Sequence, residues 1–410
     1  MSRYYKYIYY LMVFIPVIAM LIEQGESSRS IGWYMRIMYT FMALLMFMEA
    51  AITRKKLCIP KGTGLLLLYA IYIFLWGMVN GSLDRRGLIL SVVNNAHLQT
   101  VFMLIVSYNV LISDKQHHRL VRIMVFTVYV AALVSIYQIF EPSFLDFTSA
   151  REIGGSIYTL RRGSIFSNVA PLELGLSFLP ILALVTVDLL LKKSNSVIQI
   201  LLMGGIVAIL SNTRWVMVGY LIVLSMVGFQ YRSRILGRVK TISLTMVVVI
   251  LLGYVIGLLG YDFTQFWNER LLAEGSLDRT TRYLAFENFL IFFPRTPWFG
   301  TGVHLTDEIW AASRAVGSSQ IHVGYLSHLV SYGLFGSVLF FGFLFRVSQM
   351  LYKNAKKTGY WGSFYGFLVF IWGNATFVHF GMFYYGMILL FAFDKYYLDK
   401  HKRLKSVHVL

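Results

Sequence analysis

The sequence predicts an all-α polytopic integral membrane protein. Hydrophobic residues make up 57% of the 410 residues and charged residues only 14%, and the mean hydropathy is +0.64. Apolar stretches recur along the whole chain, with short polar connections between them. A soluble domain needs more polar surface than this, whereas about 20 apolar residues in helical form cross a bilayer. We therefore expect one integral membrane domain over residues 1–410.

The apolar windows predict about twelve transmembrane helices. The window 5–22 follows the basic start "MSRYYK" without a small-residue cleavage site, so we interpret it as a retained anchor. The windows 197–211 and 361–375 are short and almost continuous with their successors. In chain order, the remaining windows are 32–52, 64–80, 88–112, 121–140, 169–191, 213–229, 241–259, 323–348 and 376–394.

The net charge of +18 predicts the orientation of the chain in the membrane. Every second connection carries lysine, as in "TRKKLCIPK" and "YKNAKK", and lysine and arginine accumulate in cytoplasmic loops. Both termini are then cytoplasmic. The opposite connections carry arginine but no lysine. The use of arginine without lysine indicates a requirement for the planar guanidinium group rather than for charge alone. This group often pairs with phosphate in a bidentate way. Pairing of single arginines with acids such as Asp278 or Glu287 stays open as an alternative.

Two outer connections are longer than a simple link requires. Residues 141–171 mix glycine, serine and aromatics around Arg161 and Arg162. Residues 260–322 contain "RTTRYLAFENFLIFF", which Asp278 precedes as a plausible N-cap. This apolar helix places Arg279 and Arg282 on one face, and we expect it to lie at the membrane surface. The stretch "TPWFGTG" after it predicts a glycine turn.

The sequence also indicates which chemistry the chain does not use. It contains no Asp-x-Asp, no glycine-rich phosphate loop, no His-Glu-x-x-His and no Gly-x-Ser-x-Gly. Support is therefore lost for metal-bound nucleotide sugars, ATP, zinc and acyl-serine intermediates. Its single cysteine, Cys58, excludes an internal disulfide. No cofactor, metal or nucleic-acid partner is expected.

What remains is a cluster of basic residues expected at one depth near the outer face. Its arginines are suited to hold an anionic diphosphate and to stabilise the charge that grows as a glycosidic bond to phosphate breaks. His322 is the best placed base for a sugar hydroxyl, with Tyr325 one helical turn later. The cluster comprises Arg161, Arg162, Arg214, Arg279, Arg282 and His322, and Tyr325 is a further candidate for substrate binding.

Structural roles compete with these assignments. His322 at a helix start can be a plain interfacial histidine, and His304 is a rival candidate for the base. Other histidines in apolar windows are interpreted as satisfied interior residues, and charged residues inside windows are expected to pair internally or to line a cavity. These histidines are His97, His328 and His379, and the charged residues are Arg36, Glu49, Glu173 and Asp188.

Four segments, in this order and spacing, resemble the O-antigen polymerase and O-antigen ligase superfamily. They are "RRGSIFSNVAPLELG", "SNTRWVMVGY", "TTRYLAFENFLIFFPRTPWFGTG" and "HVGYLSHLVSYGLFG", and the likeness is strongest over residues 211–336. Arg214 matches the arginine that opens a helix after a small polar turn. Arg282 matches the arginine before an aromatic that leads to Pro-x-x-Gly-x-Gly, and His322 matches the ligase-type histidine motif.

This resemblance implies a GT-C-like helical fold and metal-independent, inverting glycan transfer from undecaprenyl diphosphate at the periplasmic face. The arginines would bind diphosphate and His322 would activate the acceptor. It also implies cooperation with a flippase and a chain-length regulator in the surrounding lipid. Ligases usually have Asn, Ser or Gln after the histidine, whereas this chain has Val323. That favours a polymerase over a ligase that transfers glycan to lipid A core. A transporter or flippase for lipid-linked oligosaccharide is the alternative from another class.

Overall fold

In the part of the chain that the computed structural model describes, the regular secondary structure is helical, with turns and irregular connections between the helices. That part comprises residues 28–53, 56–80, 96–110, 112–141, 144, 178–211, 214–231, 286–302, 324–375 and 385–407. Its helices, in order, are α2 (Ser28–Thr53), α3 (Thr63–Val79), α5 (Ala96–Asn109), α6 (Asp114–Phe140), α8 (Leu179–Leu191), α9 (Val197–Leu210), α10 (Arg214–Gln230), the short 3-10 helix η5 (Phe293–Arg295), α16 (Gly324–Thr358), α17 (Gly362–Asn374) and α18 (Tyr385–Val407).

The predicted windows locate these helices well. Every predicted window that reaches the described residues overlaps one of these helices, which confirms the all-α class. The windows 5–22 and 241–259 lie outside the described residues, as do the loop centres 145–177 and 303–323. Among the described helices, α6 and α16 are long and apolar enough to cross a membrane, and several others are shorter apolar helices. The count of twelve spans stays a prediction.

Helix boundaries differ from the windows where local chemistry sets them. α6 begins at Asp114 rather than at residue 121, because Ser113 and Gln116 form a capping box over its first turn. The Ser113 hydroxyl accepts from the Gln116 N–H, and the Gln116 side chain accepts from the Ser113 N–H. α18 continues beyond residue 394 to Val407 with a polar, basic sequence. Hydropathy detects the apolar part of such helices and misses their polar ends.

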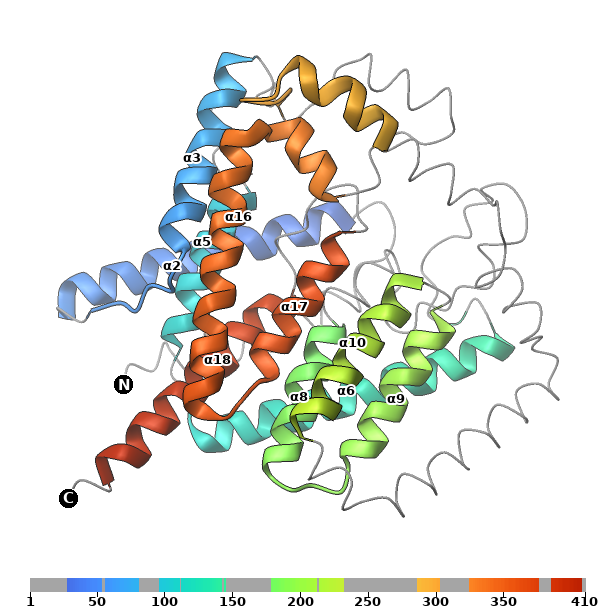
Figure 1. Cartoon of the computed structure of the whole chain (residues 1–410). Coiled ribbons are helices and arrows are strands. Elements are labelled where there is room, and N and C mark those ends of the chain that lie inside the picture. Colours follow the sequence, from blue (N-terminus) through green and yellow to red (C-terminus); the bar gives the residue numbers. More distant parts are fainter. Residues whose placement is uncertain are drawn as a thin grey trace.

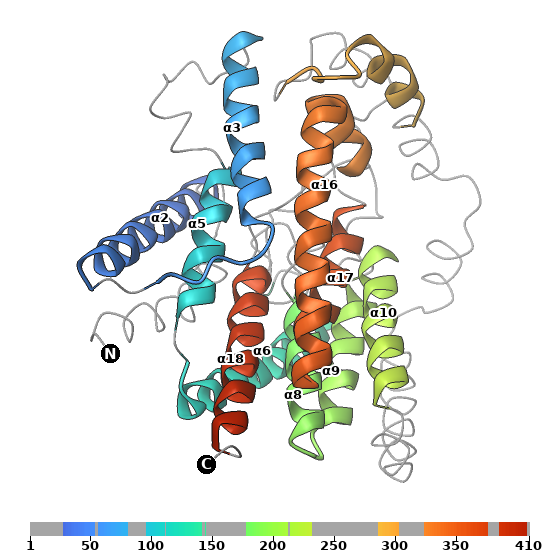
Figure 2. The same cartoon turned by 60° about the vertical axis from the view of Figure 1, so that its left-hand side comes forward.

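α17 occupies the centre of the bundle (Figure 1). It packs against α8, α10, α16 and α18, and its buried face includes Phe367, Val369 and Phe370. α3 packs beside α16 and α5, and α2 crosses α5. α6 is steeply inclined to α16 and crosses the lower ends of α8 and α9, as Figures 1 and 2 show. The core therefore lies around a short helix that is buried on most sides.

One end of the bundle carries the lysines, and we call it the lysine end. The α8–α9 turn, the connection from α16 to α17 and the C-terminal part of α18 all lie on this side, the lower one in Figure 1. The Tyr231 hydroxyl at the end of α10 donates to Gly359 O at 3.1 Å, and the Tyr360 hydroxyl donates to Leu184 O at 3.1 Å. Burial raises the pKa of Tyr360, so its hydroxyl stays a donor. These bonds join α10 and α8 to the connection between α16 and α17.

Candidate functional site

α16 is broken at Gly333, close to the end of the bundle opposite the lysines. Gly333 has φ 62° and ψ −169°, which is not helical. Residues 324–332 therefore form a separate piece, which we call the half-helix. It runs back toward the middle of the molecule, while residues 334–358 form the long part of α16 (Figures 1 and 2). The predicted window 323–348 gave no sign of this break.

The turn 296–302, "TPWFGTG", is inserted at this break. It bonds to the half-helix on one side of Gly333 and to the long part of α16 on the other. We call this arrangement the clasp. Its four backbone hydrogen bonds run from Thr301 N to Val330 O (2.9 Å), from Gly302 N to Ser331 O (2.8 Å), from Leu334 N to Pro297 O (2.8 Å) and from Phe335 N to Trp298 O (3.0 Å).

Two glycines make the close approach of the two backbones possible. Gly300 has φ +76°, and a Cβ there would lie 2.5 Å from the Ser331 carbonyl and the Tyr332 nitrogen. A Cβ on Gly333 would lie 2.5 Å from the Trp298 carbonyl. L-residues rarely adopt such φ values, and the contacting atoms are backbone that cannot move aside. The glycine turn predicted from the sequence is confirmed, and its partner is the break in α16.

α3 holds both sides of the clasp. The Tyr72 hydroxyl lies within hydrogen-bonding distance of Phe299 O (2.7 Å) and Tyr332 O (2.9 Å). Trp76 Nε1 donates to Gly300 O at 3.2 Å. These side chains provide hydrogen-bond donors for carbonyls around the irregular turn, as buried backbone carbonyls require.

The last turn of α17 joins two further segments. The Tyr325 hydroxyl, on the half-helix, donates to Ile371 O at 2.7 Å. Trp372 Nε1 donates to Trp215 O, in the first turn of α10, at 3.3 Å. We call residues 371–374 the outer turn of α17. The start of α10 and the start of the half-helix therefore meet at this turn.

The meeting point is recessed. The long part of α16, residues 334–358, is about 37 Å long, α17 about 20 Å and the half-helix about 13 Å. Because α17 is shorter than α16 and the half-helix folds back toward it, their contact lies well below the level of Gly333. The sequence predicted one common depth for the site. In the described part, the starts of α10 and the half-helix share a depth, while the clasp is farther out.

Two helix amino-terminal ends therefore lie at the outer turn of α17. The first N–H groups of a helix have no partner within it, and the helix dipole adds partial positive charge there. Such ends favour anions. This electrostatic character agrees with the prediction of an anionic substrate group near Arg214.

The predicted site residues are only partly within the described residues. Arg214 is the first residue of α10, so the prediction that it opens a helix is confirmed, and its backbone position is next to Trp215. Tyr325 is partly buried and its hydroxyl bonds to α17, so it has a structural contact, and its predicted substrate contact stays a prediction. The residues outside the described part are Arg161, Arg162, Arg279, Arg282 and His322, together with His304.

A second polar cluster lies at the lysine end. The buried Asp188 carboxylate lies 2.7 Å from His117 Nε2 and 2.7 Å from Lys192 Nζ, and it accepts from the Tyr397 hydroxyl. Burial, and then the Asp188 charge, raise the pKa of Tyr397, so the hydroxyl remains a donor. The expectation that Asp188 pairs internally is confirmed. His117 was missed because "SDKQHHR" reads as a polar connection.

His328 is an interior residue, as predicted. It is buried, its ring stacks on Phe340 with centroids 4.3 Å apart, and the Tyr69 hydroxyl lies 3.3 Å from Nε2. It lies on the half-helix, on the side that faces α3. This placement separates it from Tyr325, which contacts α17. His97 is part of the same aromatic group, with its ring centroid 4.8 Å from that of Tyr69.

Fold and site together define a helical membrane protein with a broken helix and a recessed helix junction. Residues 199–341 match the family model described as O-antigen ligase. This match confirms the resemblance to the O-antigen polymerase and ligase superfamily, whose members are glycosyltransferase-like enzymes of lipid-linked polysaccharides. The matched range includes α10, the clasp and Gly333. A search of curated proteins found no match to the chain.

Proposed function

We propose that this protein is an O-antigen or exopolysaccharide polymerase that transfers a growing glycan from undecaprenyl diphosphate to a lipid-linked repeat unit at the periplasmic face. The observation that carries the proposal is the meeting of two family-matched segments at the outer turn of α17. One of these segments begins at Arg214, and the other begins just after His322.

The donor is assigned to the arginines. A diphosphate ester carries its charge on planar oxygen sets that match the guanidinium group in a bidentate way. As the bond between the anomeric carbon and the phosphate oxygen breaks, its electron pair stays with the departing undecaprenyl diphosphate. Arg214, Arg282 and the helix ends near Trp215 stabilise that charge, and Arg161, Arg162 and Arg279 hold the donor. The leaving group then needs no strong acid.

The acceptor is assigned to the histidine. A sugar hydroxyl is a weak nucleophile, so a base with a pKa near neutrality accelerates its attack on the anomeric carbon. His322 takes the proton while the oxygen forms the new glycosidic bond, and attack from the side opposite the diphosphate inverts the configuration. Val323, in place of the polar residue usual in ligases, favours a lipid-linked repeat unit as acceptor.

Glycan profiling of a deletion strain tests this proposal. The strain is complemented with wild type, Arg214→Lys, Arg282→Lys or His322→Ala at matched membrane levels. We expect surface glycan with a single repeat unit in the deletion strain. Each variant is expected to lower long-chain polymer by about 100-fold or more. The two lysine variants keep the positive charge but lose the bidentate pairing of the guanidinium with the diphosphate, and His322→Ala loses the general base.

Other profiles would contradict the proposal in distinct ways. Full-length polymer left on its lipid carrier in the deletion strain would indicate a ligase. Unpolymerised precursor accumulating on the cytoplasmic leaflet would indicate a transporter. Normal polymer in all three variants would show that the chemistry lies elsewhere in the chain.

A further inference from the structure

We propose that the clasp is a positioning device that sets the donor-binding segment and the acceptor-activating segment of the site at a fixed separation. This inference rests on the proposed function, because it concerns the same site. Gly300, Gly333 and Tyr72 are its positioning residues. None of them is assigned a contact with substrate.

The first argument is that the clasp is a backbone connection between the two segments. In the sequence, Phe286 comes four residues after Arg282, and Gly324, where the half-helix begins, comes two residues after His322. Two of the clasp's hydrogen bonds join the turn to the half-helix, at Val330 and Ser331, and the other two join it to the start of the long part of α16. Main-chain atoms have less conformational freedom than side chains. A connection through main-chain hydrogen bonds therefore fixes the turn relative to α16 more closely than side-chain contacts would.

The second argument is that burial of side chains does not fix the turn. The side chains of Trp298 and Phe299 are 66% and 48% exposed. The turn is therefore held by its hydrogen bonds and by the two glycines, rather than by a pocket for its aromatic residues. Each broken clasp bond would leave a backbone N–H or C=O group without its partner, which is costly for a group that is buried. The clasp is accordingly expected to be formed completely or lost.

The third argument is that one side chain, Tyr72, contacts both the turn and the half-helix. The Tyr72 hydroxyl reaches a carbonyl of the turn and a carbonyl of the half-helix, Phe299 O and Tyr332 O. The ring itself packs against Phe335 with centroids 5.2 Å apart. Tyr72→Phe removes the hydroxyl and keeps the ring, so it loosens the joint without emptying the core.

Matched glycine variants separate positioning from general strain. Gly300 and Gly359 have φ values of +76° and +75°, but a Cβ meets backbone at 2.5 Å only at Gly300 and has open space at Gly359. Gly300→Ala and Gly359→Ala therefore carry the same backbone strain, and only Gly300→Ala separates the clasp. Tyr72→Phe is matched by Tyr220→Phe, whose hydroxyl donates to Leu201 O at 2.8 Å between α10 and α9.

The assay uses purified full-length protein in lipid nanodiscs with lipid-linked repeat unit isolated from the deletion strain. We expect Gly300→Ala and Gly333→Ala to lower kcat by about 100-fold, as a misplacement of about 1 Å does, with KM changed less than about 3-fold. Tyr72→Phe is expected to lower kcat by about 10-fold, and Gly359→Ala and Tyr220→Phe to retain wild-type kcat. Unchanged kcat in Tyr72→Phe and Gly300→Ala would overturn the inference, as would equal losses in the control variants.

A second measurement does not depend on activity. The chain has one cysteine, so Cys58→Ser provides a clean background for Arg282→Cys with His322→Cys. A set of bifunctional maleimides of increasing length measures the separation of the two positions. We expect one narrow range of effective lengths in this background and a broad range after Gly300→Ala, with Gly359→Ala narrow. Identical ranges in all three would contradict a positioning role.

The two proposals can fail separately. Full activity of Arg282→Lys and His322→Ala would refute the proposed site, whatever the clasp variants do. Loss of activity in those variants, together with normal kcat in the clasp variants, would refute the positioning role alone. A fall in kcat that tracks a fall in folded protein, measured by detergent size exclusion for each variant, would also refute it.

Discussion

At the scale of single residues, Asp188 has the most demanding environment in the described part of the protein. Its carboxylate is fully buried, and its partners come from α6, from α18 and from the turn after α8. A charge in such surroundings is tolerated because His117 and Tyr397 both contact Oδ1, and the Lys192 ammonium group lies 2.7 Å from Oδ2. The His117 ring is in turn stacked on Tyr396, with centroids 3.8 Å apart. Removal of the carboxylate would leave these donors buried without their acceptor.

We therefore expect Asp188→Ala to destabilise the protein by about 3–5 kcal/mol, the usual cost of breaking a buried ion pair. Thermal unfolding in detergent measures the change. The matched control is Asp399→Ala, whose pair with Lys395 is partly exposed and is expected to contribute less than about 1 kcal/mol. Equal unfolding temperatures for Asp188→Ala and Asp399→Ala would show that the Asp188 cluster is not a main support of the fold.

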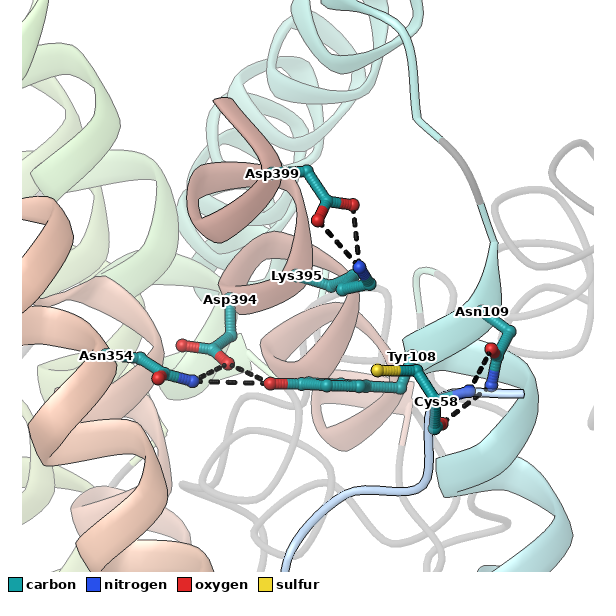
Figure 3. A network of polar contacts seen from close by, with 7 residues as sticks. All are labelled: Cys58, Tyr108, Asn109, Asn354, Asp394, Lys395 and Asp399. Carbon is teal, nitrogen blue, oxygen red and sulfur yellow. Dashed lines mark hydrogen bonds and ion pairs between the residues drawn. The ribbon is translucent and has the colours of Figure 1, made fainter. Parts of the chain in front are cut away.

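At the scale of elements, a polar joint ties α5, α16 and α18 together at one point. The Tyr108 hydroxyl donates to Asp394 Oδ2 at 3.0 Å, and Asn354 Nδ2 donates to the same oxygen at 2.8 Å (Figure 3). Nearby, the Asn109 side chain pairs with both backbone groups of Cys58, at 2.7 and 2.8 Å. Each helix thus contributes one side chain, and the connection before α3 is fixed to the end of α5.

A double-mutant cycle tests this joint. Tyr108→Phe and Asn354→Ala each remove one donor from a buried carboxylate, so each is expected to cost about 1–3 kcal/mol. Because both donate to one oxygen, the double variant should differ from the sum of the single variants by at least about 0.5 kcal/mol. Tyr129→Phe is the control, since its hydroxyl donates to Gln199 in an exposed bond of 3.0 Å. Strict additivity would mean that the three helices do not act together here.

The element scale also shows what sequence alone could predict. Helix positions follow from hydropathy summed over many residues, so the windows found the described helices even where single residues were ambiguous. The break in α16 depends on the close approach of Gly300 to Gly333, two residues far apart in the chain. The pairing of His117 with Asp188 is equally remote in sequence. A single sequence contains no direct signal for such contacts.

The same limit applies to the candidate site. Arg214 was predicted at a helix start because a small polar turn precedes it, and that prediction is local and confirmed. The prediction of one membrane depth for the basic residues stays a prediction, because most of them lie outside the described residues. The contact of the start of α10 and the start of the half-helix with the outer turn of α17 depends on the short length of α17 and on the break in α16. Hydropathy reports neither of these two features.

At the scale of the whole molecule, the bundle has a lysine end and an opposite end that carries the clasp. The lysine end includes the ends of α8, α16 and α18 (Figure 1). Cys58 bonds to Asn109, and the neighbouring Tyr108 accepts from Asn354 near the end of α16. The clasp lies near the other end of α3, where Trp76 and Asn80 contact it. Lysine is retained on the cytoplasmic side of a bilayer during insertion. The distribution of lysine therefore predicts that the lysine end faces the cytoplasm and that the clasp lies toward the opposite side of the membrane.

Cysteine labelling in intact cells tests that orientation, because the exposed Cys58 is the chain's one native cysteine. We expect a membrane-impermeant maleimide to label Cys58 only after the inner membrane is permeabilised. Thr301→Cys in the Cys58→Ser background, placed in the clasp, should be labelled in cells with only the outer membrane opened. Because position 301 is only partly exposed, we expect its cysteine to react slowly. The labelling of this position is therefore expressed relative to that of a denatured sample. Labelling of both positions from the same side would invert or disprove the predicted topology, and with it the periplasmic placement of the site.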